Sequence, residues 1–204
     1  MNKFSLLLTI PIMLLMACAG GNQESTQEST ESTTMFTGAK GEVKLMNLDP
    51  GHFHAALVQK SMYNQMDPKV FVYAPEGSDV KDYMTLINGY NTRSESPTSW
   101  DQVIYTGPDY LEKMLAEKPG NVMVTAGNNK KKTEYILKTI QAGVNVLADK
   151  PMVINKEGFA DLEKAFAEAE KNDVLLYDIM TERHEVTTII QRELSKISAV
   201  FGEL

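Results

Sequence analysis

The stretch AGVNVLADKP, residues 142–151, decides the fold of this chain. Ala142-Gly143 is typical of a helix end, because glycine readily adopts the left-handed conformation that stops a helix. The mostly apolar run that follows, residues 144–148, predicts a buried strand. This strand leads directly into the polar turn Asp149-Lys150-Pro151. A helix, a buried strand and a polar turn in immediate succession favour a parallel sheet covered by helices.

The same order of elements repeats on both sides of this stretch. Short apolar runs predict strands at residues 43–48, 70–73, 103–105, 122–125, 144–148 and 174–177. Apolar residues at helical spacing predict helices at residues 53–66, 78–89, 109–117, 133–142, 155–169 and 185–196. Six alternations predict the α/β class with a doubly wound parallel sheet. In such sheets ligands bind beyond the carboxyl ends of the strands.

Composition narrows the classes of function. The 204 residues are 43% hydrophobic and 23% charged, as in an ordinary globular protein, and the net charge is -7. A nucleic-acid partner is not expected, because neutralising phosphates needs a basic face. Residues 91–100 are polar and aperiodic, which predicts an exposed insertion.

The N-terminal segment predicts export. Residues 6–17 are an apolar run too short to span a bilayer, and the sequence Leu15-Met16-Ala17-Cys18 resembles a lipobox. We therefore expect a lipoprotein signal peptide over residues 1–18, with a lipid on Cys18 that anchors the chain to the bacterial envelope, facing the periplasm or the cell surface. An ordinary cleaved signal peptide is the alternative. Residues 19–41 contain the Gln-Glu-Ser-Thr repeat and predict a flexible tether.

The turn after the first strand contains Asp49, Gly51, His52, Phe53 and His54. A dinucleotide-binding fold would hold the pyrophosphate here, at the start of the first helix. The usual Gly-x-Gly-x-x-Gly is absent, and only its Gly51 remains. The two histidines could bond a phosphate or sugar, or could be exposed turn residues. A metal site would need further ligands, and the sequence offers no evident Cys or carboxylate partner, so no metal is predicted.

The second strand is followed by Glu76, which lies 25 residues beyond Gly51. An acid at about this interval can grip the ribose hydroxyls of a dinucleotide. Asp79 could do the same, and either residue could equally be an exposed acid. Because neither a clear Asp nor an Arg follows this strand, the choice between NAD and NADP stays open.

From residue 42 to about residue 177 the chain resembles the Gfo/Idh/MocA family of oxidoreductases. In that family one strand ends in Thr-Pro-Asn or similar, a His stands three residues later, and the next strand ends in Glu-Lys-Pro. Gly127-Asn128-Asn129 falls on Thr-Pro-Asn, Lys132 on the His, and Asp149-Lys150-Pro151 on Glu-Lys-Pro. The glycine fingerprint, Asn128, Lys132 and Asp149 depart from the family.

The resemblance implies a Rossmann-like domain over residues 42–184 that binds NAD or NADP. The cofactor-binding residues that we expect are Asp49, Gly51, His52, Phe53, His54, Glu76, Gly127, Asn128, Asn129, Lys132, Asp149, Lys150 and Pro151. It also implies a catalytic role for Lys150, beside the nicotinamide and the hydroxyl of a sugar or polyol substrate. Arg183 and His184 are candidate crevice residues, or polar residues on the surface.

Family members carry a second α/β domain, which often forms an oligomer interface. Residues 185–204 are therefore expected to be a linking helix and the first strand of a missing or truncated second domain, and a homo-oligomer is possible. The full-length protein is expected to be an NAD(P)-dependent oxidoreductase, whereas the 204-residue chain alone is expected to bind a dinucleotide without efficient turnover. Two alternatives stay open. An exported lipoprotein could keep the Rossmann-like domain for glycan or partner binding without redox turnover, or the 204-residue chain could have no activity.

Overall fold

A computed structural model describes residues 36–203. The predicted signal segment and most of the predicted tether lie outside the described residues. Six parallel strands form one sheet in the order β3-β2-β1-β4-β5-β6. The strands are β1 (Leu45–Leu48), β2 (Lys69–Ala74), β3 (Asp101–Thr106), β4 (Val122–Thr125), β5 (Asn145–Ala148) and β6 (Leu176–Asp178). This order, which reverses direction between β1 and β4, confirms the predicted doubly wound α/β fold.

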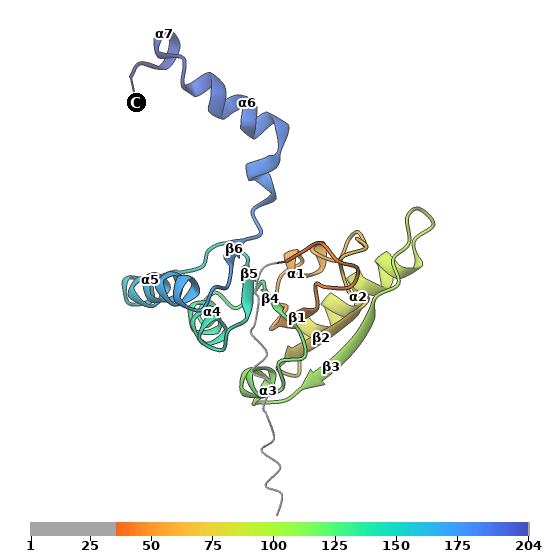
Figure 1. Cartoon of the computed structure of the whole chain (residues 1–204). Helices are drawn as coiled ribbons and strands as arrows, with labels where there is room; N and C mark the ends of the chain where they lie inside the picture. The colour runs from red at the N-terminus through yellow and green to blue at the C-terminus, as the bar shows by residue number, and fades with distance from the viewer. Residues whose placement is uncertain (1–35, 204) are drawn as a thin grey trace, which may run out of the picture. The chain divides into compact units, whose positions relative to one another are not determined.

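The helices are α1 (His54–Leu57), α2 (Ser78–Thr92), α3 (Tyr110–Glu117), α4 (Lys132–Gln141), α5 (Lys156–Lys171), the 3-10 helix η1 (Thr181–His184), α6 (Val186–Ser195) and α7 (Ser198–Phe201). In Figure 1, α1 and α2 lie on one side of the sheet, and α3, α4 and α5 lie on the other. Among the described residues, no helix combines the length and apolar character needed to cross a membrane.

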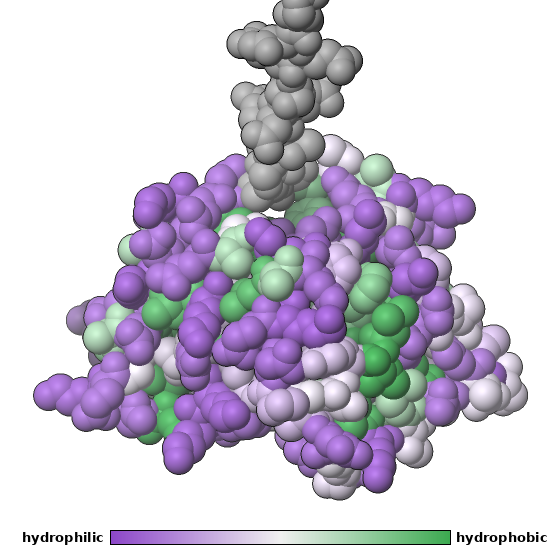
Figure 2. All heavy atoms as spheres, turned by 90° about the horizontal axis from the view of Figure 1, so that it is seen from below, coloured by the Kyte–Doolittle hydropathy of each residue, from purple (hydrophilic) through white to green (hydrophobic). Residues whose placement is uncertain are grey.

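Two hydrophobic clusters fill the space between the sheet and its helices. Alternate residues of a strand point to opposite faces, so β1 contributes Leu45 to one cluster and Met46 to the other. Both faces of the central strands are therefore buried, as an all-parallel sheet requires. The outer surface is mostly hydrophilic on the face shown in Figure 2, with small hydrophobic patches between the polar side chains.

The register brings the carboxyl ends of the strands to one edge. Leu48 at the end of β1 pairs with Tyr73 of β2 and with Thr125 of β4. Thr125 pairs with Ala148 of β5, which pairs with Asp178 of β6. The turns that follow these residues therefore share one edge of the sheet, where the sequence analysis expected the ligand site.

The first helix is shorter than predicted, and beyond its end distant side chains bond the backbone carbonyl groups. The prediction was residues 53–66, whereas α1 ends at Leu57. The carbonyl of Gln59 accepts a hydrogen bond from Trp100 Nε1 at 2.6 Å, and that of Lys60 accepts one from Arg93 at 2.6 Å. The predicted exposure of residues 91–100 is wrong for Thr98 and Trp100, which are both buried.

Two further expectations differ from the structure. Phe159 and Phe166 are apolar residues of the predicted helix over residues 155–169, yet both are about half exposed on α5, while Leu162, Ala165 and Ala169 are buried. The C-terminal segment, expected to start a strand, forms the short helix α7. Since no strand pairs with it among the described residues, its N–H groups bond back within the segment, as Phe201 does to the carbonyl of Ile197.

Candidate functional site

The turns after β1 and β4 touch backbone to backbone. A Cβ on Gly127 would lie only 2.6 Å from both Cα and N of Gly51, and Gly127 has a φ of 129°. The N–H of His52 bonds the carbonyl of Ala126 at 2.9 Å and reinforces this contact. Position 127 therefore requires glycine, both for its backbone conformation and for the close approach to Gly51.

Asp49 is buried at the end of β1 and holds the turn in place. Its Oδ2 accepts hydrogen bonds from Asn128 Nδ2 at 2.9 Å and from the hydroxyl of Tyr135 at 2.7 Å. Burial and the hydrogen bonds with Tyr110 and Asp49 raise the pKa of Tyr135, so the hydroxyl keeps its proton and donates to Asp49. Sequence reasoning missed Tyr135, because at its helical spacing it was indistinguishable from an ordinary core residue.

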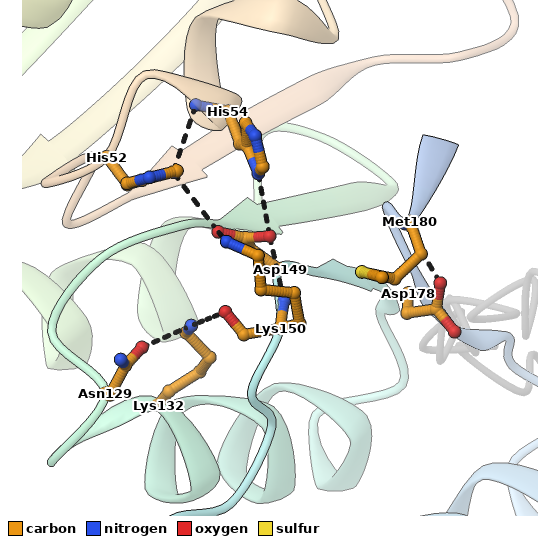
Figure 3. A network of polar contacts seen from close by, with 8 residues as sticks. All are labelled: His52, His54, Asn129, Lys132, Asp149, Lys150, Asp178 and Met180. Atoms are coloured by element: carbon orange, nitrogen blue, oxygen red, sulfur yellow. Dashed lines mark hydrogen bonds and ion pairs between the residues drawn. The ribbon is translucent and has the colours of Figure 1, made fainter. Parts of the chain in front are cut away.

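Asp149, directly after β5, is only 2% exposed and lies at the centre of a polar network (Figure 3). Its Oδ1 is 2.9 Å from His54 Nδ1 and accepts the backbone N–H of Lys150 at 2.8 Å. Its Oδ2 is 3.3 Å from His52 Nδ1 and 3.8 Å from Lys150 Nζ. The sequence analysis found no carboxylate partner for the two histidines. The structure supplies one, because β1, β4 and β5 are neighbours in the sheet.

The environment of His52 keeps its ring neutral near pH 7. Burial lowers the pKa of His52, and the neighbouring His54, Lys150 and Lys132 lower it further, while the carboxylate of Asp149 acts in the opposite direction. The result is a pKa below the ordinary value of 6.5. A neutral imidazole has a free ring nitrogen that can accept a hydrogen bond or bind a ligand.

Lys132 lies at the start of α4 and is fully buried. Its Nζ donates hydrogen bonds to Asn129 Oδ1 at 2.7 Å and to the carbonyl of Lys150 at 3.4 Å (Figure 3). Burial lowers the pKa of Lys132, and the nearby Lys150 lowers it further, while Asp149 raises it. Lys132 therefore joins the turn after β4 to the turn after β5, which the sequence alone did not indicate.

A pocket of about 320 Å³ lies over these turns. It is lined by Gly51, His52, Gly127, Asn128, Asn129, Asp149, Lys150 and Pro151, all of them predicted site residues. The side chain of Lys150 is about half exposed, so its ammonium is accessible beside the buried carboxylate of Asp149. The structure thus brings together residues that the sequence placed in three separate turns.

A second pocket, of about 150 Å³, lies beyond the end of β2 and is lined by Asp49, Pro50 and residues 74–80. This set includes both predicted acids, Glu76 and Asp79. The described residues that line it include no Lys or Arg. The pocket is therefore acidic and adjoins the first through the turn at residues 49–51.

A third pocket, of about 280 Å³, lies on the other side, between α1 and the end of β6. Its lining is mostly apolar and consists of His54, Leu57, Val58, Leu147, Tyr177, Asp178, Ile179, Met180 and His184. His184, a candidate crevice residue, belongs to this set. Arg183 does not line the pocket, but it forms an ion pair at 2.6 Å with Asp178, which does. Sequence reasoning missed Tyr177 and Asp178, although the end of the sixth strand was an expected ligand position.

Phe53 lines none of these three pockets. Its ring is exposed and lies 4.5 Å from the ring of His52 and 4.4 Å from that of His54, measured between centroids. Phe53 therefore covers the outer side of the two histidines and is a support for the turn.

The first turn differs from a glycine-rich phosphate loop. The N–H of Gly51 bonds the carbonyl of Asp49 at 2.8 Å, and the N–H of His52 is used by Ala126. These two donors are therefore engaged within the protein. An anion in the central pocket would depend more on side chains such as Lys150 and His52 than on the backbone.

The family GFO_IDH_MocA, described as "Oxidoreductase family, NAD-binding Rossmann fold", matches residues 75–178. This segment runs from the turn after β2 to the end of β6 and includes Lys150. The search of curated proteins found no match.

Three solved structures illustrate the relationship. A "putative oxidoreductase" from Parabacteroides merdae ATCC 43184 is 64% identical, with a TM-score of 0.78, and the match covers 82% of this chain and 38% of that one. A biliverdin reductase in complex with biliverdin and NADP+ from Synechocystis sp. PCC 6803 is 12% identical, with a TM-score of 0.56 and 76% and 44% coverage. A UDP-N-acetylglucosamine 3-dehydrogenase from Acidithiobacillus ferrooxidans is 14% identical, with a TM-score of 0.51 and 74% and 41% coverage. This chain therefore spans less than half of the length of each.

Proposed function

Because the chain belongs to the Gfo/Idh/MocA oxidoreductase family, whose domain is an NAD-binding Rossmann fold, we propose that residues 42–184 bind NAD or NADP and serve hydride transfer with a sugar or polyol. The observation that carries the proposal is the position of Lys150. Its exposed ammonium lies at the carboxyl end of β5, in the pocket formed where three turns meet.

The order of the three pockets supports a dinucleotide. The acidic pocket at β2 suits a ribose, whose hydroxyls can donate to Glu76 or Asp79. The central pocket offers His52 to phosphates and Lys150 to the substrate oxygen, and the mostly apolar pocket at β6 suits the flat ring beside it. The three follow the edge of the sheet, as an extended dinucleotide would.

The backbone contact between Gly51 and Gly127 bears on whether a dinucleotide fits in the central pocket. Since neither glycine carries a side chain, the central pocket stays open above the crossing, whereas a Cβ on Gly127 would collide with the backbone of Gly51. The residues present therefore fit a dinucleotide, with side chains taking over contacts that a glycine-rich loop makes through its backbone.

Lys150 is the proposed catalytic residue. The cofactor, when bound, accepts or supplies the hydride. The ammonium of Lys150 can donate a hydrogen bond to the substrate oxygen and help to move its proton. Asp149 accepts the backbone N–H of Lys150 and lies 3.8 Å from its Nζ, so it positions the lysine.

The substrate class rests on relatives. One relative of the same fold is a UDP-N-acetylglucosamine 3-dehydrogenase, which acts on a sugar nucleotide. Polar residues that line the third pocket, such as Asp178 and His184, are suited to sugar hydroxyls. A sugar or polyol is therefore the substrate class that we propose.

Binding of the cofactor can be tested directly. NADH and NADPH are titrated into the 204-residue chain, and the nicotinamide fluorescence is followed. We expect saturable binding of at least one of them, weakened about tenfold, or about 1.4 kcal/mol, by Lys150→Met. The matched control is Lys164→Met, since Lys164 is exposed on α5 and lines none of the three pockets. No binding of NAD(H) or NADP(H) would overturn the proposal and leave glycan or partner binding as the better reading.

We also propose that a lipid on Cys18 anchors the chain to the bacterial envelope. The supporting observation is the apolar run followed by Leu15-Met16-Ala17-Cys18. Mass spectrometry of the N-terminal peptide should find a lipid on Cys18 as the first residue, and Cys18→Ser should move the protein from the membrane to the soluble fraction. An unmodified mature N-terminus at another residue would instead identify an ordinary signal peptide.

A further inference from the structure

We propose that His52, His54 and Asp149 form a binding site for one divalent transition-metal ion of the zinc class. Within the described residues, one ligand atom from each of these side chains lies within 4.8 Å of the other two. This inference rests on the three side chains themselves and does not require that the chain bind a dinucleotide.

The ligand types and their separations fit such an ion. Two imidazoles and a carboxylate are a frequent three-residue set for zinc, which leaves a fourth position open. Around an ion with bonds of 2.0–2.2 Å, tetrahedral ligand atoms lie about 3.3–3.6 Å apart. The Nδ1 atoms of His52 and His54 lie 3.3 and 2.9 Å from the two oxygens of Asp149, so small rotations would open the required space.

Hydrogen bonding leaves one contact of this cluster unexplained. The backbone N–H of His54 donates to His52 Nδ1 at 3.4 Å, so this ring nitrogen acts as an acceptor. The same nitrogen lies 3.3 Å from Asp149 Oδ2, and a dashed line marks this contact in Figure 3. With His52 Nδ1 unprotonated, this nitrogen and the carboxylate oxygen are both electron-pair donors, and a cation between them would be attracted to both.

The carboxylate of Asp149 also has room for another positive partner. Its Oδ1 is engaged by His54 and by the N–H of Lys150, whereas Oδ2 has only His52 and, at 3.8 Å, the ammonium of Lys150. Lys132, the other nearby ammonium, is directed instead to Asn129 and to the carbonyl of Lys150. A buried carboxylate needs a close cation or several donors, and a metal ion would satisfy Oδ2.

The position of the cluster gives an ion both access and a chemical role. His52 and Asp149 line the central pocket and His54 lines the apolar pocket, so the cluster stands between the two. An ion there would have its open position toward these pockets, where it could polarise a hydroxyl or carbonyl oxygen or hold a phosphate oxygen.

The test uses the metal alone. The 204-residue chain carries Cys18→Ser, which removes its one thiol, is freed of metal with a chelator, and is titrated with Zn²⁺ by calorimetry and with Co²⁺ by visible absorption. We expect one ion per chain and the intense d–d bands of a tetrahedral cobalt site. His52→Ala, His54→Ala and Asp149→Asn should each weaken binding by about 100-fold or more, since loss of even an outer partner costs about 10–100-fold.

The matched control is His184→Ala, because His184 is the third and last histidine of the chain and lies outside the cluster. It should bind metal as the parent does. His52→Ala is informative even if His54→Ala misfolds, because the side chain of His52 is already about one-third exposed, and circular dichroism checks each fold. The proposal is overturned if the parent binds no ion saturably, if His52→Ala and Asp149→Asn bind as the parent does, or if His184→Ala abolishes binding. NADH titration of the metal-free chain tests the proposed function separately.

Discussion

The hydroxyl of Tyr135, in the middle of α4, donates a 2.7 Å hydrogen bond to Oδ2 of Asp49, in the turn after β1. Both groups are buried, and they are 86 residues apart in the chain. The bond therefore ties the helix that precedes β5 to the turn that borders the central and acidic pockets. Its loss should affect both the stability of the fold and the shape of the site.

Tyr135→Phe removes this donor and leaves Asn128 as the other side-chain donor to Asp49. Because a buried acceptor then loses a partner, we expect the free energy of unfolding to fall by about 1–3 kcal/mol in urea denaturation. Tyr63→Phe is the control, since Tyr63 is exposed and should change stability by less than about 0.5 kcal/mol. Equal effects of the two substitutions would show that the buried bond contributes little.

Gly127→Ala places a Cβ against the backbone of Gly51 and also requires alanine to adopt a φ of 129°. Backbone strain of about 1–3 kcal/mol and overpacking of about 1–3 kcal/mol should add to a loss of about 2–6 kcal/mol in unfolding free energy. Gly143→Ala is the matched control, because Gly143 has a φ of 75° but its Cβ would meet nothing within 4 Å. If Gly143→Ala costs as much as Gly127→Ala, the crossing of the loops is not the cause.

Lys132 should make stability depend on pH in the alkaline range. Its pKa is lowered in the folded chain from the ordinary 10.5, so the unfolded chain binds this proton more tightly. The free energy of unfolding should therefore rise with pH between the lowered folded pKa and about 10.5. Below that window the buried ammonium destabilises the folded chain by a constant amount. In Lys132→Met, the rise measured by urea denaturation from pH 7.5 to pH 10 should be smaller than in the parent.

The control for this effect is Lys164→Met, which removes a lysine that is exposed on α5. Its rise in stability with pH should match that of the parent, because other alkaline groups act equally in both proteins. A parent-like slope in Lys132→Met would contradict the assignment of the effect to the buried ammonium.

The acidic pocket should favour NAD over NADP, if the proposed function holds. A 2′-phosphate would face Glu76 and Asp79, and like charges brought together in this way oppose binding. The double substitution Glu76→Gln with Asp79→Asn should therefore strengthen NADPH binding by about tenfold or more relative to NADH, measured by fluorescence titration. Asp82→Asn, on an exposed position of α2, should leave the preference unchanged.

The fold could be predicted from the sequence because strand and helix periodicity are local. Six short apolar runs separated by helical spacing were enough to predict the parallel sheet, and residues 142–151 were enough to suggest the family. The length of α1 could not be predicted, since Trp100 and Arg93 determine it from distant positions by bonding the carbonyls of Gln59 and Lys60. The exposure of Phe159 and Phe166 also depended on how α5 packs against its neighbours.

By itself, the sequence determined which turns contain residues suited to ligand binding or catalysis, because each polar turn follows its strand along the chain. Only the tertiary structure decided which of these turns meet. His54 and Asp149 are 95 residues apart, and they lie 2.9 Å apart because β4 alone separates β1 from β5 in the sheet. Strand order depends on the path of the crossover helices and on burial of both faces of the sheet, and neither is encoded in the local spacing of residues. Lys132 was predicted from the sequence to bind the cofactor. That it is fully buried and links two turns also depends on strand order, which the local spacing does not encode.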